Sequence, residues 1–190
     1  VGATSLAVNL ASILAASPER SVVLVDLDVT LGDADVYLDT IPEYTLADLT
    51  QNAARLDAEL LRRSLARHKS GLYLLPRPVE LSDARLVTPE PLQRVLGLLK
   101  ASHSHVLVDL SKAYSPLDMA ALECCDAVLL VTQLDLPCLR NVVRLLKSFQ
   151  PVPGLSEKVK LVINRALPES EAIRLKRAEE IVGREFFWQV

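Results

Sequence analysis

Three aspartates stand where the sequence could support metal chemistry. Asp26 and Asp28 lie two residues apart at the end of the apolar run VVLVDLD, and Asp109 ends the similar run HVLVDL. Carboxylates at the end of a buried strand are costly unless a cation or hydrogen-bond donors meet them. The pair Asp26–Asp28 therefore suits magnesium binding and the positioning of a water molecule, with a simple turn cap at Asp28 as the alternative. Asp109 has the place of a carboxylate that holds magnesium through water.

A second candidate feature opens the chain, where Gly2-Ala3-Thr4-Ser5 runs directly into the helical pattern LAVNLA. Glycine lets a backbone approach phosphate, and a helix N-terminus offers unpaired N–H groups and a positive dipole end. A hydroxyl in the first turn, such as that of Thr4, can reach a magnesium ion. The same residues also suit an ordinary helix cap. The order of this loop and helix, the Asp26–Asp28 strand and the Asp109 strand is more specific than any single part.

The elements that must position these residues alternate between short apolar runs and longer helical patterns. Strands are predicted at 21–26, 72–75, 105–109, 127–132, 160–164 and 186–190, and helices at 4–16, 46–52, 58–68, 89–102, 117–124, 137–149 and 170–182. Most strands are continuously apolar, which is typical of a sheet covered on both faces. Strands separated by helices require right-handed crossovers, so the predicted fold is α/β, a doubly wound and mostly parallel sheet with helices on both faces.

Ligands bind at the carboxyl ends of the strands in such sheets. The polar strand ends are therefore expected to converge; they are Asp26, Asp28, Asp109, Thr132-Gln133 and Asn164-Arg165.

Composition excludes several classes of protein. The chain has 190 residues, about one domain, and with 50% hydrophobic and 24% charged residues it is not disordered. A net charge of −3 argues against electrostatic binding of nucleic acid. Three cysteines, of which Cys124 and Cys125 are neighbours, make no disulfide framework and favour a reducing cytoplasm, with buried structural thiols expected at that pair. The three histidines lack metal-ligand spacing, so solvated or strand-edge roles are expected.

The motifs together resemble a known family. GATSLAVNLA, VVLVDLDVTLGDADVYLD, HVLVDL, AVLLVTQLDLPCLRN and LVINR look like the MinD/ParA group of deviant Walker A ATPases, and most like its CpaE/TadZ pilus-assembly branch. The resemblance covers nearly the whole chain. It implies a Rossmann-like, three-layer P-loop NTPase domain over residues 1–190 that begins inside the phosphate loop. The opening strand is then expected to precede Val1, and further chain to follow Val190.

The resemblance also implies roles for individual residues. Gly2 is similar to the last glycine of the loop, Thr4 to its magnesium-binding hydroxyl, and Ser5 follows at the start of the helix. Asp26 is similar to the carboxylate near the metal, Asp28 to the one that orients the attacking water, and Asp109 to the Walker B aspartate. Asn164 and Arg165 are similar to a pair whose asparagine binds adenine, and Arg140-Asn141 falls near the dimer face.

One position departs from the family, because Ala3 stands where the group has a lysine beside the phosphates. Loss of such a charge commonly costs a few kcal/mol in a desolvated site, so weaker binding or slower hydrolysis is expected; the CpaE/TadZ branch also has alanine here. The implied cofactors are ATP and Mg²⁺. The implied partners are a second copy, in an ATP-dependent homodimer, and proteins of pilus assembly or polar localisation. The resemblance implies a cytoplasmic protein and is compatible with a position at a cell pole or at the periphery of the inner membrane. Contact with the membrane would then be indirect or made by segments outside this sequence.

Other classes remain as alternatives. A catalytically weak or inactive nucleotide-binding scaffold is made plausible by Ala3. A receiver-type signalling domain also gathers aspartates at strand ends, yet it needs a lysine where Asn164-Arg165 stands and has no insertion as long as residues 28–72. A nicotinamide-binding fold is disfavoured because no G-x-G-x-x-G follows a strand.

Overall fold

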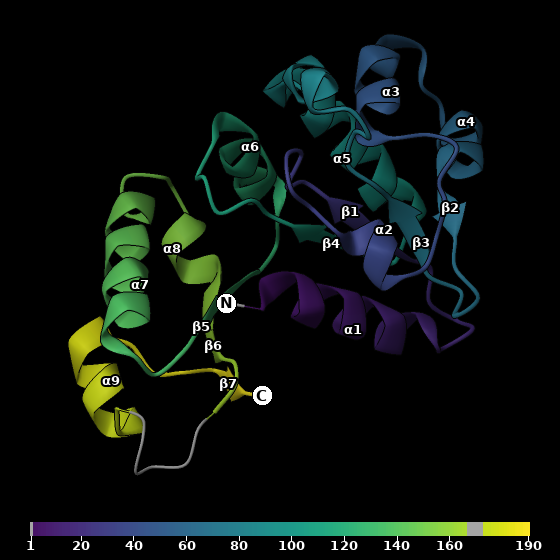
Figure 1. Cartoon of the computed structure of the whole chain (residues 1–190). Coiled ribbons are helices and arrows are strands. Elements are labelled where there is room, and N and C mark those ends of the chain that lie inside the picture. Colours follow the sequence, from purple (N-terminus) through teal and green to yellow (C-terminus); the bar gives the residue numbers. More distant parts are fainter. Residues whose placement is uncertain (1, 167–172) are drawn as a thin grey trace. The chain divides into compact units, whose positions relative to one another are not determined.

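The computed structural model describes residues 2–166 and 173–190 (Figure 1). They form two compact units. Ala3–Cys124 is called the aspartate unit here, and Gly2 together with residues 125–166 and 173–190 is called the asparagine unit. The predicted α/β class with mostly parallel strands is confirmed. The strands pair as two sheets, one in each unit, rather than as the single sheet expected. Among the described residues, no strand pairing joins the edge strand β4 (His105–Asp109) of one sheet to the edge strand β5 (Val128–Thr132) of the other.

The sheet of the aspartate unit has the order β2 (Ala66–Arg67), β3 (Tyr73–Leu75), β1 (Val22–Asp26) and β4 (His105–Asp109). β1 runs parallel to both β3 and β4, as predicted, and its register pairs Asp26 with Asp109. Every residue of β1 is buried. The two buried carboxylates therefore leave neighbouring strands at the same level of the same sheet edge.

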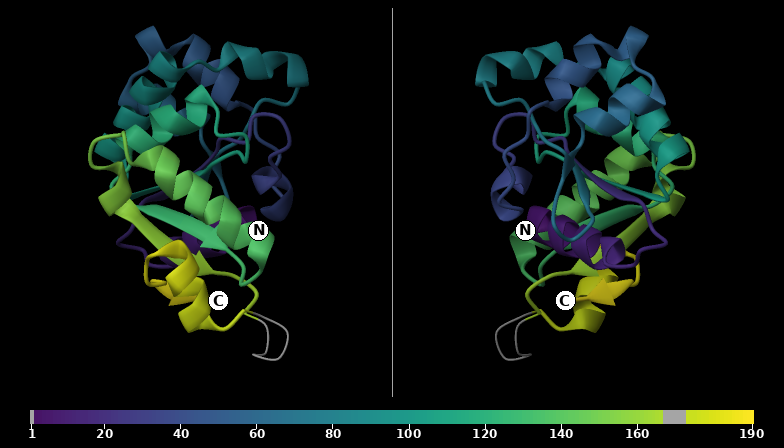
Figure 2. Two further views of the ribbon diagram at one scale, coloured as in Figure 1. Left: turned by 90° about the vertical axis from the view of Figure 1, so that its left-hand side faces the viewer. Right: turned by 90° about the vertical axis from the view of Figure 1, so that its right-hand side faces the viewer.

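Helices cover both faces of this sheet. α1 (Ala3–Ala15) and α2 (Ala34–Tyr37) lie on one face, and α3 (Leu46–Gln51), α4 (Ala58–Ser64), α5 (Pro89–Ser102) and α6 (Pro116–Cys124) lie on the other. Val22 and Leu24 pack toward α1, whereas Val23 and Val25 pack toward α5. Figure 2 shows purple α1 apart from the blue and teal helices α3, α4 and α5. The continuous apolar run of β1 is explained by this cover on both sides.

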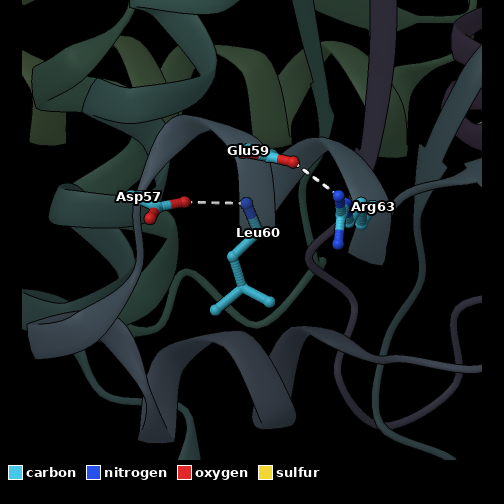
Figure 3. Close-up of polar contacts among 4 residues, drawn as sticks. All are labelled: Asp57, Glu59, Leu60 and Arg63. Atoms are coloured by element: carbon cyan, nitrogen blue, oxygen red, sulfur yellow. Dashed lines mark hydrogen bonds and ion pairs between the residues drawn. The ribbon is translucent and has the colours of Figure 1, made fainter.

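The helix predicted at 58–68 is shorter than expected. α4 begins at an N-cap, Asp57, whose side chain accepts a hydrogen bond from the Leu60 backbone N–H at 2.8 Å, and it ends at Ser64 (Figure 3). The next residues form β2, an antiparallel partner of β3. The turn that joins them depends on Gly71, whose φ of +88° suits glycine. Pairing within this hairpin outweighs the helical periodicity of the sequence.

The asparagine unit has a fully parallel sheet in the order β5 (Val128–Thr132), β6 (Val159–Ile163) and β7 (Trp188–Gln189). Its helices are α7 (Leu136–Phe149), α8 (Leu155–Lys158) and α9 (Leu175–Val182). The predicted helix at 170–182 begins only at Leu175; its residues 170–172 lie outside the described part of the chain. Leu129 of β5 and its register partner Lys160 of β6 are both exposed, so cover on both faces is less complete here than predicted.

Two further observations concern the cysteines and membrane-spanning helices. Cys124 and Cys125 are partly exposed rather than buried, because they stand where α6 ends. Among the described residues, no helix has both the length and the apolar character needed to cross a membrane.

Candidate functional site

Asp26 is the most deeply buried acid of the aspartate unit, with none of its surface exposed. Its Oδ1 accepts a hydrogen bond from the Asp28 backbone N–H, and its Oδ2 accepts one from Ala34, both at 3.1 Å. The carboxylate also rests against Gly32, where a Cβ would overlap both of its oxygens. Burial, with a smaller contribution from the nearby Asp109, raises the pKa of Asp26 to about 7, against the two backbone donors that lower it. A cation beside this carboxylate would stabilise its charged form and lower its pKa.

Asp109 stands beside Asp26 at the end of β4 and is only 4% exposed. Burial raises the pKa of Asp109, and a hydrogen bond with the Thr4 side chain opposes that rise. Its Oδ2 is buried and has no hydrogen-bond partner among the described residues, a condition shared there only by Oδ1 of Asp35 in α2. Buried polar atoms are rarely left unpaired. The unpaired oxygen of Asp109 is therefore available to a cation.

Asp28 lies in the loop that follows β1 and is partly exposed. Its Oδ1 accepts hydrogen bonds from the Thr30 hydroxyl at 3.0 Å and the Leu31 backbone N–H at 3.1 Å. No described residue donates to its Oδ2. Asp28 thus shapes its own turn, as the simpler interpretation expects, and still has one oxygen able to accept a hydrogen bond from water.

The start of α1 brings the predicted phosphate-binding residues of this unit together. Ala3, Thr4 and Ser5 occupy its first turn, which contains no acidic residue. Thr4 reaches Asp109, and the Ser5 hydroxyl donates to the phenol oxygen of Tyr37 in α2 at 3.2 Å. The unpaired N–H groups and the positive end of the helix dipole favour an anion here.

These residues fit magnesium held jointly with phosphate groups, rather than a complete protein cage. Among the described residues, no group of three or more His, Cys, Asp or Glu side chains is arranged to hold a metal ion. Magnesium commonly takes only one or two carboxylates and completes its octahedron with water and substrate phosphates. Asp26, Asp109 and the Thr4 hydroxyl match that donor set, and the orphaned oxygen of Asp109 is the observation that favours it.

The asparagine unit brings together a different set of predicted residues. Asn164 follows β6 and continues its ladder by donating its backbone N–H to Thr132 at 2.8 Å. Its Oδ1 accepts from the backbone N–H of Arg165 at 3.0 Å, and Arg165 has a positive φ of 56°. Gly2, with a φ of +76°, passes so near the Asn164 amide that a Cβ at Gly2 would overlap Nδ2. A positive φ at a residue other than glycine, as at Arg165, is strained, and such strain is concentrated at functional sites. That these residues share one site with the carboxylates of the aspartate unit stays a prediction.

Two residues of the aspartate unit were not anticipated from the sequence. Gly32 provides the close approach to Asp26, and a glycine among the turn residues after the strand is the signal that could have indicated it. Arg77 donates from Nε to the carbonyl of Gly32 and from Nη1 to that of Pro78. The sequence indicates Arg77 more weakly, as a single arginine between two prolines directly after β3.

The three histidines and the pair Arg140-Asn141 are the remaining candidates from the sequence. His68 directly follows β2, His103 lies two residues before β4, and His105 begins β4. Their side chains contact Ser70, Ser102 and Ser104, respectively. Arg140 and Asn141 are exposed on α7, and nothing in the structure tests their predicted place near a dimer face.

Comparison with known proteins gives related sequences and folds. No protein-family model matches the chain. The septum site-determining protein MinD of Thermotoga maritima is 24% identical over 170 residues, which are 88% of this chain and 61% of that protein. The chain thus spans less than two thirds of the length of this relative.

Solved structures match more completely. A ParA family ATPase from Chlorobium tepidum shares 25% identity at a TM-score of 0.92, covering 100% of this chain and 78% of that one. MinD of Pyrococcus horikoshii, solved with Mg-ADP, shares 21% at a TM-score of 0.81, covering 100% and 75%. MinD of Aquifex aeolicus, in a MinC:MinD complex, shares 19% at a TM-score of 0.77, covering 98% and 75%.

Proposed function

We propose that this chain, which has the fold of the MinD/ParA-family ATPases, binds Mg-ATP and hydrolyses it slowly. The observation that carries the proposal is the pair of buried carboxylates, Asp26 and Asp109, beside the Thr4 hydroxyl, with one oxygen of Asp109 left unpaired. A MinD of this fold has been solved with Mg-ADP, which supports the same ligand class here.

The predicted site residues have separate roles in this proposal. The first turn of α1 binds phosphate through its backbone N–H groups, and the Thr4 hydroxyl, Asp26 and Asp109 hold the magnesium ion directly or through water. Magnesium, when bound, neutralises the negative charge that shifts between phosphate oxygens during transfer. Asp28 accepts a hydrogen bond from the attacking water with its Oδ2 and so orients that water. Asn164 binds the adenine through its amide.

Ala3 makes the reaction slow rather than impossible. The loop amides and the helix dipole contact the phosphates in both the ground state and the transition state, so they support nucleotide affinity more than rate. A lysine at this position would act where charge is redistributed in the transition state. The ATP-bound state should therefore be long-lived, which suits a switch better than a motor.

The experiment that tests the proposal measures phosphate release from the full-length protein with Mg-ATP. Asp28→Ala should lower kcat about 100-fold or more, since general-base or water-positioning groups contribute about 10²–10⁴, while affinity for Mg-ATP changes little. Asp33→Ala is the matched control, because Asp33 is an exposed acid of the same loop whose side chain makes no cap hydrogen bond. Equal turnover in the wild type and the Asp28 variant would reject the hydrolytic role.

A second candidate is a scaffold that binds nucleotide without turnover, and Ala3 is the observation that favours it. Ala3→Lys separates the two functions. For a slow ATPase, the substitution raises kcat with little change in nucleotide affinity. For a scaffold, phosphate release stays at the level of Asp28→Ala in both proteins.

The cellular role is proposed from the resemblance to the CpaE/TadZ branch. ATP joins two copies into a dimer, and the dimer positions machinery for pilus assembly or marks a cell pole. The relatives support a positioning role in general, since one is a septum site-determining protein and another forms a complex with MinC. Light scattering of the Asp28→Ala variant tests the dimer: doubling of the mass with Mg-ATP and not with Mg-ADP is expected, and an unchanged mass contradicts it.

A further inference from the structure

We propose that Arg77 is a positioning residue that fixes the loop 28–33, and with it Asp28, to the chain leaving β3. The loop follows β1, and Arg77 follows β3, the parallel neighbour of β1. Both segments therefore leave the same edge of one sheet, within one unit. The resemblance assigns no role to Arg77. Only the effect on turnover rests on the function proposed above; the effect on the loop does not.

The contacts of Arg77 join two backbone segments. Nε donates to the carbonyl oxygen of Gly32, and Nη1 donates to the carbonyl oxygen of Pro78 at 2.7 Å. The base of the side chain is itself well held, because Pro76 and Pro78 are buried and the Pro76 carbonyl accepts the backbone N–H of Leu46 at 2.8 Å. The Arg77 guanidinium thus reaches Gly32 of the loop from a segment whose backbone is buried and hydrogen-bonded.

Gly32 is the point at which a small shift would matter most. Its backbone N–H donates to the Asp28 carbonyl at 2.9 Å, its Cα lies against the Asp26 carboxylate, and its carbonyl receives Arg77. Displacement of the Gly32 peptide would therefore disturb both the surroundings of the Asp26 carboxylate and the turn that begins at Asp28.

The other contacts of the loop do not replace this one. Oδ1 of Asp28 is held by Thr30 and Leu31, which belong to the same loop and would move with it. The Leu27 N–H bonded to the Asp109 carbonyl and the Asp28 N–H bonded to Asp26 fix the start of the loop, and the Ala34 N–H bonded to Asp26 fixes the chain after it. Arg77 holds Gly32, near the end of the loop, from another element.

Arginine suits this task better than lysine would. Its planar guanidinium presents several donors in a rigid fork, so one side chain can serve two carbonyl groups at once. Hydrogen bonds from a charged donor are also stronger than neutral ones. A lysine at this position keeps the charge and loses the fixed geometry, which makes Arg77→Lys a graded probe of positioning.

The test compares Arg77→Ala, Arg77→Lys and Arg63→Ala in the full-length protein. Arg63 is the matched control, since it is an arginine of the same unit whose ion pair with Glu59 is exposed on both sides (Figure 3). Hydrogen exchange of the amides in residues 27–36 and steady-state kinetics with Mg-ATP are both measured. Exchange in 105–109, the β4 strand, reports whether the fold as a whole is intact.

We expect Arg77→Ala to speed exchange at Gly32 and Ala34 about tenfold or more, with 105–109 unchanged, because lost anchoring opens the loop locally. It should lower kcat about tenfold with KM within about threefold of wild type, since Asp28 acts on the attacking water and not on substrate affinity. Arg77→Lys should recover part of both effects. Arg63→Ala should match wild type.

Two results would overturn the inference. One is loop exchange that Arg77→Ala leaves unchanged, whether or not the protein hydrolyses ATP. The other is faster loop exchange with kcat unaltered in a protein whose turnover depends on Asp28. If the wild type shows no turnover above the Asp28 variant, the proposed function fails by itself, and exchange alone decides the role of Arg77. If Arg77→Ala unfolds, the same readouts are taken from Arg77→Lys.

Discussion

The strand ends of the two units differ in the kind of polar group that they bury. β1 and β4 of the aspartate unit end in carboxylates, 0% and 4% exposed, whose pKa values are raised by burial. β5 of the asparagine unit ends in Thr132, 2% exposed, and β6 is followed by Asn164, both neutral. Neutral groups are satisfied by backbone hydrogen bonds such as those of Asn164, whereas buried charges need a counter-charge. The strand ends of the first unit therefore favour a cation, and those of the second favour neutral hydrogen bonding.

The largest effect that tests this comparison is the pH dependence of stability in nucleotide-free protein. The pKa of Asp26 is about 7 in the folded chain against 3.8 for the ordinary group. Between these values the folded state binds more protons than the unfolded state, so the free energy of unfolding falls as pH rises from about 4 to 7. A difference of about three pKa units corresponds to about 4 kcal/mol.

Urea denaturation at pH 5 and pH 8 measures the part of this effect that falls between those two values, about 3 kcal/mol. Asp26→Asn should remove most of the difference, because it leaves no charge to bury, while Asn164→Ala should keep it. A wild-type protein equally stable at both pH values would contradict the burial of an unpaired charge in the aspartate unit.

The next effect is the dependence of ATP affinity on magnesium. Asp109→Asn should weaken ATP binding about 100-fold in the presence of Mg²⁺, since loss of a group that holds the ion costs about 10–100-fold in related metal sites. In EDTA the variant and the wild type should bind ATP alike. Calorimetric titration in both buffers measures this, and an equal loss in both would show that Asp109 acts on the nucleotide without the metal.

A smaller effect concerns the cradle of Asp26. Gly32→Ala places a Cβ where the carboxylate oxygens lie, and overpacking of this kind costs about 1–3 kcal/mol. Gly97→Ala is the matched control: this glycine lies within α5 with nothing within 4 Å of an added Cβ, so alanine should stabilise the helix by up to about 1 kcal/mol. Thermal unfolding of both variants measures the difference, and equal melting temperatures would contradict close packing at Gly32.

The smallest effect belongs to the asparagine unit. Asn164→Ala should weaken ATP binding about tenfold, the value of one or two neutral hydrogen bonds, equally with Mg²⁺ and with EDTA. GTP, which lacks the adenine edge, should be affected less. A loss that appears only with Mg²⁺ would place Asn164 with the cation-binding residues and erase the distinction between the two units.

Much of the fold could be predicted because its signals are local. The runs 105–109 and 89–102 agree with β4 and α5 as predicted, since a β-branched run ending in aspartate and a Thr88-Pro89 start signal need no distant partner. β2 was missed because its two residues become a strand only through pairing with β3. The α9 boundary and the exposure of Leu129 likewise depend on neighbours that periodicity does not specify.

The sequence by itself determined which residues can do chemistry: Asp26 and Asp109 end strands, Asp28 follows one, and Thr4 lies in the first turn of a helix. The parallel order of β1 and β4 follows from the helices that separate the strands along the chain. Only the tertiary structure decided their state. Whether a carboxylate is charged depends on how many atoms surround it and which donors reach it, and those atoms come from distant segments. Gly32, Ala34 and Thr4 meet Asp26 and Asp109 through chain folding alone, so the raised pKa values and the unpaired oxygen of Asp109 appear only there.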